Sequence, residues 1–225
     1  MSITLLVICI VTGSLLWLDR VFMFQLMISR PIIIASVLGF VLGNFPVGLL
    51  VGASIELIWI NSAPVGSYLP NDDSFCAIVA VPSAIAASTW MSQSSAAGLA
   101  LVLSLPTSYL GRYVDMRIRI ANQTLIPRDI AQFEHRIAST MYRALARAFF
   151  YILIPVGICV MIFYYLTVFT APKLPAFVTA SLEYLPYVCI VIGVAGLFQQ
   201  SRSKIAQAGS FILGMLAVLL VTWMF

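Results

Sequence analysis

Charged side chains are scarce in this chain: 9% of its 225 residues are Asp, Glu, Lys or Arg, whereas 62% are hydrophobic. A soluble domain carries roughly 25% charged residues, so this composition excludes an ordinary water-soluble domain. Apolar runs recur along the whole length, and a helix of roughly 20 apolar residues spans a hydrocarbon core of about 30 Å. The sequence therefore predicts an all-α polytopic membrane protein.

Metal-binding and catalytic motifs are also lacking. The four cysteines are far apart without a CxxC spacing, and His135 is the sole histidine, which speaks against a zinc site or a disulfide framework. The chain has no Walker loop, no glycine-rich dinucleotide fingerprint and no Ser/His/Asp order to build on. We therefore expect no metal, no cofactor and no catalysis by the chain on its own.

Eight apolar segments are candidates for membrane-embedded helices. They are residues 3–18, 31–45, 47–62, 75–91, 96–111, 148–170, 184–199 and 206–225. The first lacks the basic start and cleavage motif of a signal peptide, so we expect it to be retained. The second and third are divided only by a turn signal at residues 44–46. This pair either crosses the membrane as a tight hairpin or re-enters as two half-helices.

Arginine is concentrated in one part of the chain. Of the 12 Lys and Arg residues, seven, all arginine, lie within residues 112–147. Such basic segments mark the cytoplasmic side of membrane proteins, so they do not indicate nucleic-acid binding. With residues 112–147 in the cytoplasm, the eight segments predict eight crossings with both termini outside. This topology also places Arg20, Arg30 and residues 202–204 on the cytoplasmic side. All multi-charge loops thus agree with one topology.

A second pattern lies inside this basic segment. Pro127 and Asp129 are typical of a helix start, and apolar residues follow at helical spacing as far as Ala144. We expect a cytoplasmic amphipathic helix that lies against the inner leaflet or a partner protein, or that serves only as a topological anchor. The whole chain, residues 1–225, is predicted to be a single integral membrane domain in which 111–147 is a basic cytoplasmic connecting segment.

Two glycine pairs flank the 44–46 turn, Gly39 with Gly43 and Gly48 with Gly52. Glycine at this spacing allows two helix backbones to approach closely in lipid. The pattern predicts tight packing of the two segments, with a moving interface as the alternative.

Polar groups at membrane depth are concentrated between residues 52 and 73. Ionisable groups are costly there, so each is a candidate for function. The candidates are Glu56, Asn61, Asn71, Asp72 and Asp73. Carboxylates and amides can bond vicinal hydroxyls, and the aromatic rings of Trp59 and Tyr68 can cover the apolar face of a sugar. The segment predicts a site for a neutral polyol such as a sugar.

Structural roles compete with this interpretation. Glu56 could be a paired or protonated carboxylate that holds helices together, and Asp72 or Asp73 could cap a helix that begins before Phe75. A second polar cluster is either functional or an interfacial anchor loop. It contains Asp19, Arg20, Gln25, Ser29 and Arg30 and ends at a proline suited to a helix start.

Four stretches of the chain resemble one protein family. They are residues 25–32 (QLMISRPI), Gly39-x-x-x-Gly43-Asn44, residues 48–52 (GLLVG) and residues 55–59 (IELIW). They resemble the enzyme IIC permease subunit of the mannose/fructose/sorbose branch of the bacterial sugar phosphotransferase system. Residues 64–72 (PVGSYLPND) also look like that family's segment after the membrane glutamate. The specific part of the resemblance covers roughly residues 14–80.

The resemblance implies a multi-pass protein of the bacterial cytoplasmic (inner) membrane. Such a subunit forms an oligomeric complex with a IID membrane subunit, binds a hexose-type sugar from outside and passes it inward by an elevator-like motion. Soluble IIA and IIB proteins, which carry the phosphoryl groups, then phosphorylate the sugar. By the same match, Glu56 belongs to the sugar-binding core, with Asn61, Asn71 and Asp72 as candidate ligands. The alternatives are a membrane scaffold or sensor without transport, and a secondary transporter independent of phosphoryl transfer.

Overall fold

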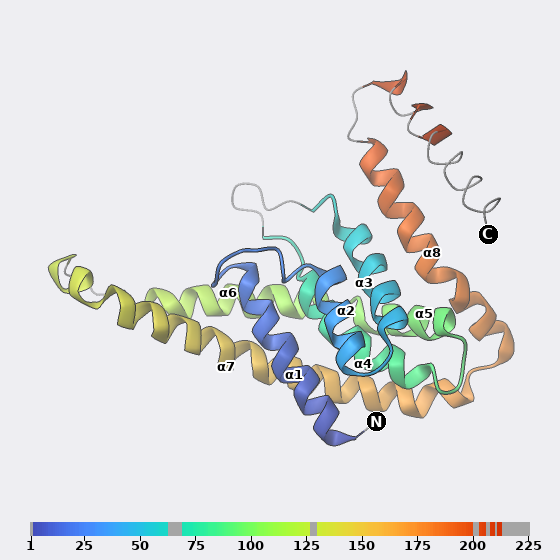
Figure 1. Cartoon of the computed structure of the whole chain (residues 1–225), viewed down its shortest axis with the longest axis horizontal. Coiled ribbons are helices and arrows are strands. Elements are labelled where there is room, and N and C mark those ends of the chain that lie inside the picture. Colours follow the sequence, from blue (N-terminus) through green and yellow to red (C-terminus); the bar gives the residue numbers. More distant parts are fainter. Residues whose placement is uncertain are drawn as a thin grey trace.

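All the regular secondary structure in the described part of the chain is helical (Figure 1). The computed structural model describes residues 2–62, 69–126, 130–199, 203–205, 208–209 and 211–212, with side chains left out at 130–136 and 197–199. Its elements are α1 (Ile3–Trp17), η1 (Leu18–Arg20), α2 (Pro31–Val41), α3 (Phe45–Trp59), α4 (Asp73–Ala87), α5 (Gln93–Ser104), α6 (Thr107–Gln123), α7 (Ile130–Thr170), η2 (Ala171–Lys173) and α8 (Ala176–Gln199). The predicted all-α membrane class is confirmed. The last predicted segment, 206–225, lies almost entirely outside the described residues.

Side-chain caps explain where several helices begin. The side chain of Asn44 accepts the Val47 N–H at 3.4 Å at the start of α3, and that of Ser92 accepts the Ser95 N–H at 3.2 Å at the start of α5. These oxygens satisfy amide donors that have no partner within the helix. Helix α2 begins at Pro31, where the missing N–H costs no hydrogen bond.

Within the described residues, three stretches are long and apolar enough to cross a membrane: Ile3–Arg20, Ile137–Lys173 and Ala176–Gly196. Helices α2, α3, α4 and α5 have 11, 15, 15 and 12 residues. At 1.5 Å per residue they are about 16–22 Å long, which is shorter than the hydrocarbon core. They follow one another as two hairpins, α2–α3 and α4–α5. Each hairpin starts and ends on the same side of the membrane, whether it crosses fully or re-enters. The prediction that Arg20, Arg30 and residues 112–147 lie on the cytoplasmic side therefore holds in both cases.

Glycine brings the two helices of the first hairpin into backbone contact. A Cβ built on Gly39 would lie 2.9 Å from the Cα of Gly48, and one on Gly52 would lie 2.8 Å from the Pro31 carbonyl oxygen. The predicted tight packing is therefore confirmed for Gly39, Gly48 and Gly52. Gly43 differs, because it lies in the turn at φ +80° with open space around it. Its role is to allow the left-handed turn conformation.

The predicted segment 96–111 is wrong as a single helix. Helix α5 ends at Ser104, and a new helix, α6, begins at Thr107 after Pro106. Proline has no N–H to donate and clashes with the preceding turn, so the chain changes direction there. Residues 107–111 therefore belong to α6, which continues through much of the basic segment.

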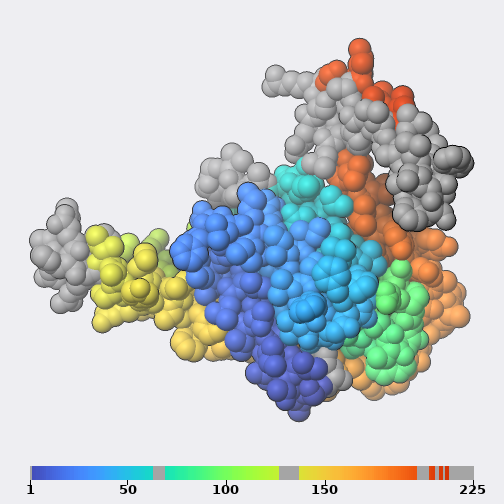
Figure 2. Space-filling view, viewed as in Figure 1, coloured from blue at the N-terminus to red at the C-terminus, as the bar shows by residue number. Residues whose placement is uncertain are grey.

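The later part of α6 and the first part of α7 form an arm that projects from the rest of the molecule (Figures 1 and 2). Asn122 Nδ2 donates to the Ala144 carbonyl oxygen at 3.4 Å, and Arg147 Nη1 donates to Thr124 Oγ1 at 3.1 Å. The predicted helix in this segment exists, but it is not a separate element. It continues without a break into the apolar part of α7, 41 residues in all. The predicted start at Pro127 and Asp129 lies outside the described residues.

Candidate functional site

A cavity of about 600 Å³ lies where η1, the start of α2, the end of α3, the start of α4 and α6 meet. Its polar lining residues are Asp19, Arg20, Gln25, Ser29, Arg30, Ser62, Asp73, Ser74, Asp115 and Arg119. Trp59 contributes an aromatic ring to the same lining. The volume is within the range of small-molecule sites, about 300–1,000 Å³.

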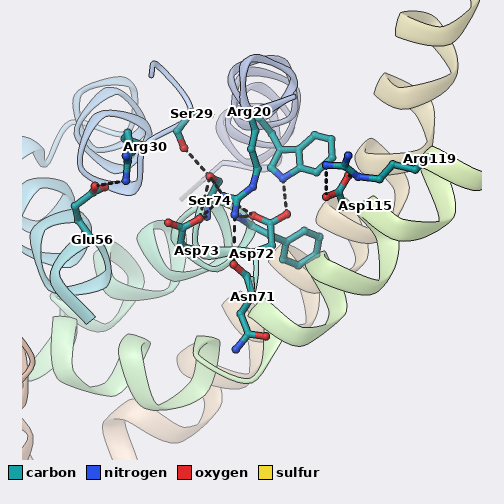
Figure 3. Close-up of polar contacts among 12 residues, drawn as sticks. Arg20, Ser29, Arg30, Glu56, Asn71, Asp72, Asp73, Ser74, Asp115 and Arg119 are labelled. Atoms are coloured by element: carbon teal, nitrogen blue, oxygen red, sulfur yellow. Dashed lines mark hydrogen bonds and ion pairs between the residues drawn. The ribbon is translucent and has the colours of Figure 1, made fainter. Parts of the chain in front are cut away.

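Arg20 ties the end of α1 to the beginning of α4 (Figure 3). Its Nη1 pairs with Asp73 and donates to Ser74 Oγ at 2.9 Å, and its Nη2 donates to the Asn71 carbonyl oxygen at 3.3 Å. Asp72 Oδ1 is 3.5 Å from the same Nη1. A guanidinium has five donors in a rigid fork, so one side chain can hold several acceptors at once. Arg20 thereby fixes the carboxylate of Asp73 at the cavity.

Asp72 holds helices together instead of lining the cavity. Its side chain is buried; Oδ1 accepts the Phe75 N–H at 2.9 Å, and Oδ2 accepts the indole N–H of Trp17 at 2.6 Å. The first bond caps α4, as the alternative interpretation of this residue proposed. The second anchors α1, because Trp17 is itself fully buried.

Glu56 has a cationic partner that is distant in the sequence. Its Oε1 is 3.1 Å from Nη1 of Arg30, the residue that precedes α2 (Figure 3). The second oxygen, Oε2, is buried and accepts no hydrogen bond from the described residues. Arg30 lines the cavity whereas Glu56 does not. The pair therefore joins α2 to α3 immediately behind the cavity.

Neither of the two predicted asparagines is part of the cavity lining. The Oδ1 atom of Asn71 is buried and accepts no hydrogen bond from the described residues. Asn61 packs against α8, where any side chain on Gly196 would overlap its amide nitrogen. Tyr68, the second predicted aromatic cover, lies outside the described residues. Of the five predicted ligands, Asp73 alone is in the lining.

The second polar cluster is the part of the sequence that the site prediction left out. Asp19 accepts the Leu26 N–H at 3.0 Å and the Ile28 N–H at 2.8 Å. Gln25, just before Leu26, and Met27, between Leu26 and Ile28, have φ angles of 55° and 63°. Left-handed conformations cost non-glycine residues roughly 1–2 kcal/mol, and the two bonds to a buried carboxylate offset this cost. The folded connection brings Gln25 and Ser29 to the cavity.

Helix α6 supplies two further cavity residues that the sequence did not single out. Arg119 Nε donates to Asp115 Oδ1 at 3.0 Å, and its Nη2 donates to Oδ2 at 3.1 Å. Asp115 is buried, whereas 43% of the Arg119 side chain is exposed. The sequence signal was a carboxylate and an arginine four residues apart on one helix, a spacing also typical of ordinary surface pairs.

These groups can bind a polar molecule by hydrogen bonds and aromatic contact. Among the residues that the structure describes, no group of three or more His, Cys, Asp and Glu side chains could hold a metal ion. The lining instead alternates carboxylates with guanidinium groups and adds the Trp59 indole. Such a lining matches a ligand with several hydroxyl groups and an apolar face.

A family model described as PTS system sorbose-specific IIC component matches residues 1–224. The chain belongs to this family. A relative of this sorbose-type IIC chain, the N-acetylgalactosamine permease IIC component 1 of Escherichia coli (strain K12), is 30% identical over 109 residues. The aligned part is 48% of this chain and 38% of that relative. The IIC family consists of membrane transport subunits, and the resemblance noted in the sequence is confirmed.

Two solved structures share the fold of this IIC chain. One is described as a structure of a membrane protein and has a TM-score of 0.66 at 16% identity. The alignment covers 99% of this chain and 95% of the chain in that structure. The other is the cryo-EM structure of the mannose transporter ManYZ in complex with microcin E492. It has a TM-score of 0.60 at 20% identity, covering 97% of this chain and 87% of that chain. At these identities the likeness concerns the fold alone.

Proposed function

We propose that this chain is the sugar-translocating IIC subunit of a mannose-type phosphotransferase complex in the bacterial cytoplasmic membrane. The observation that carries the proposal is the cavity of about 600 Å³, which combines fixed polar groups with one aromatic side chain in a chain of the IIC family. The chain works with a IID membrane subunit, as the pairing in the name ManYZ suggests. Soluble IIA and IIB proteins phosphorylate the sugar on the cytoplasmic side.

Within this proposal the predicted ligands have different tasks. Asp73 accepts sugar hydroxyls directly, because it lines the cavity and Arg20 holds it in place. Glu56 acts from behind Arg30 and reaches the sugar when that ion pair opens. Asp72 keeps α4 and α1 in position. Asn61 and Asn71 become ligands in a conformation in which the segments that follow α3 and precede α4 have moved toward the cavity.

The sugar itself is a hexose or a substituted hexose. The relative's name supports including N-acetylated hexosamines. We therefore propose testing uptake of labelled mannose, sorbose, fructose and N-acetylgalactosamine by vesicles that contain this chain with its IID partner. Phosphoenolpyruvate and the soluble phosphotransferase proteins are enclosed in one set of vesicles and omitted from the other. Accumulation of a sugar phosphate only in the first set is the expected result.

Replacing Trp59 with alanine is expected to lower uptake and sugar affinity about tenfold, because an aromatic face contributes roughly 1–3 kcal/mol to stacking. Trp59→Phe keeps a ring and is expected to retain most of the affinity. Trp90→Ala is a matched control, since Trp90 is 49% exposed and is not part of the cavity lining. Equal loss in Trp59→Ala and Trp90→Ala would contradict the assignment of Trp59. A stable complex with IID that binds no sugar would instead favour a scaffold or sensor.

A further inference from the structure

We propose that Arg119, oriented by Asp115, binds the phosphoryl group at this cavity, so that the IIC chain itself contacts the phosphorylated sugar or its phosphoryl donor. The inference rests on the proposed function, because it assigns a second kind of ligand to the same cavity. Its starting point is the cluster of three arginines in the lining: Arg20, Arg30 and Arg119. The lining also holds three carboxylates, so what matters is not the total charge but which arginine has N–H donors left to bind phosphoryl oxygens.

The three arginines are not equivalent. Arg20 is mostly buried, and its N–H donors are used at the beginning of α4. It pairs with Asp73 and donates to Ser74 Oγ and to the Asn71 carbonyl oxygen. Its task is structural. Arg30 is tied to Glu56 through Nη1.

Arg119 combines fixed orientation with exposure. Its bonds to Asp115 use Nε and one N–H of Nη2. Of the five donors of a guanidinium, three therefore remain for a ligand. Because Asp115 is buried, the pair is held in one geometry in a way that an exposed surface pair is not. An arginine whose planar fork is already positioned loses little conformational freedom when it binds a phosphoryl oxygen.

Repulsion from the carboxylates of the lining is limited, because each of them already has a partner. Asp73 pairs with Arg20, and Asp115 pairs with Arg119. Asp19 accepts the backbone N–H groups of Leu26 and Ile28. A phosphoryl group that approaches Arg119 therefore meets carboxylates that already accept hydrogen bonds from guanidinium or backbone N–H donors.

Orientation supports the same assignment. Positive residues mark the cytoplasmic side, and Arg119 lies on α6 within the basic segment 112–147. The cavity therefore opens toward the compartment in which the sugar is phosphorylated. A phosphoryl group is present there in two forms, on the hexose phosphate product and on the soluble donor protein, and both present the same anionic oxygens.

The test uses the complete membrane complex purified in detergent. Affinity for a transported hexose and for its 6-phosphate is measured for the wild type, Arg119→Gln, Arg119→Lys and Arg117→Gln. Arg117 is the matched control, because it lies on the same helix but donates to Tyr113 and does not line the cavity. Glutamine removes the charge that strengthens a hydrogen bond to a phosphoryl oxygen, so we expect Arg119→Gln to lower the ratio of hexose phosphate to hexose affinity about tenfold or more. Arg119→Lys is expected to lose less, and Arg117→Gln to leave the ratio unchanged.

A second arm identifies the source of the phosphoryl group. Single-turnover formation of hexose phosphate from the phosphorylated IIB protein is measured for the same variants. Slower transfer with an unchanged affinity ratio assigns Arg119 to the donor, and a lowered ratio assigns it to the product. If neither quantity differs between Arg119→Gln and Arg117→Gln, the inference is overturned while the proposed function stands. If the wild-type complex binds no hexose at all, the proposed function itself is contradicted, and the inference about Arg119 falls with it.

Discussion

Replacement of Arg20 by glutamine is expected to lower the midpoint of thermal unfolding by roughly 10 °C. The substitution leaves the carboxylates of Asp72 and Asp73 without their cation, and Asp72 is 1% exposed. Breaking a buried ion pair by removing one partner costs about 3–5 kcal/mol, because the remaining charge is uncompensated. That is a large share of the 5–15 kcal/mol by which folded proteins are typically stable. The midpoint is measured by tryptophan fluorescence of the purified protein in detergent.

The matched control for this change is Arg143→Gln. Arg143 is exposed on the arm and lies outside the cavity lining, so an effect near zero is expected there. In the double variant Arg20→Gln with Asp73→Asn, part of the loss should be recovered, because one of the two uncompensated charges is also removed. Equal midpoints for Arg20→Gln and Arg143→Gln would show that the Arg20 cluster does not stabilise the fold.

Replacement of Gly98 by alanine is expected to be the second severe change, with a loss of about 3 kcal/mol. A Cβ at Gly98 would overlap the backbone carbonyl of Leu182 on α8. Pro186 has no N–H to donate back to that carbonyl, and the backbone of α5 packs against it at this point. Backbone atoms cannot rotate away as a side chain can, so α5 and α8 have to separate. The thermal midpoint in detergent and the yield of monodisperse protein both report this change.

The same substitution at Gly157 is the control. The nearest atom to a Cβ there is Ile10 Cγ2, at an ordinary contact distance of 3.7 Å. Because alanine restricts the unfolded chain and favours helix, Gly157→Ala is expected to be neutral or to stabilise by about 0.5–1 kcal/mol. The expected result is thus that alanine lowers the thermal midpoint at position 98 and leaves it unchanged or raises it at position 157. A loss at Gly157 as large as that at Gly98 would mean that the close approach of α5 to α8 is not the cause.

Much of the fold followed from local signals. The scarcity of charge predicted membrane helices, the turn at 44–46 separated α2 from α3, and Gly39 with Gly48 predicted their close contact. These features depend on residues near one another in the chain. The break at Pro106 was also a local signal, but the surrounding apolar run obscured it.

The site was predicted less completely, because its members come from distant segments. Glu56 has no cation nearby in the sequence, yet Arg30 pairs with it from 26 positions away. Asp72 and Asp73 are adjacent, but one is buried against Trp17 and the other lines the cavity. Arg119 reaches the cavity because α6 packs against α4, where Gly111 lies against Asp72 and Phe75. The periodicity and spacing of residues in a single sequence do not reveal such contacts between distant segments.

The unbroken course of α7 has a mechanical consequence. A helix of 41 residues is about 60 Å long and resists bending along its ladder of hydrogen bonds. Its outer part forms the arm, while Ala148 and Ile152 mark the point from which it is buried in the core. A force applied to the arm is therefore transmitted along the helix into its buried part. Pro155, about one turn further on, has no N–H to donate to the preceding turn, so bending of α7 concentrates there.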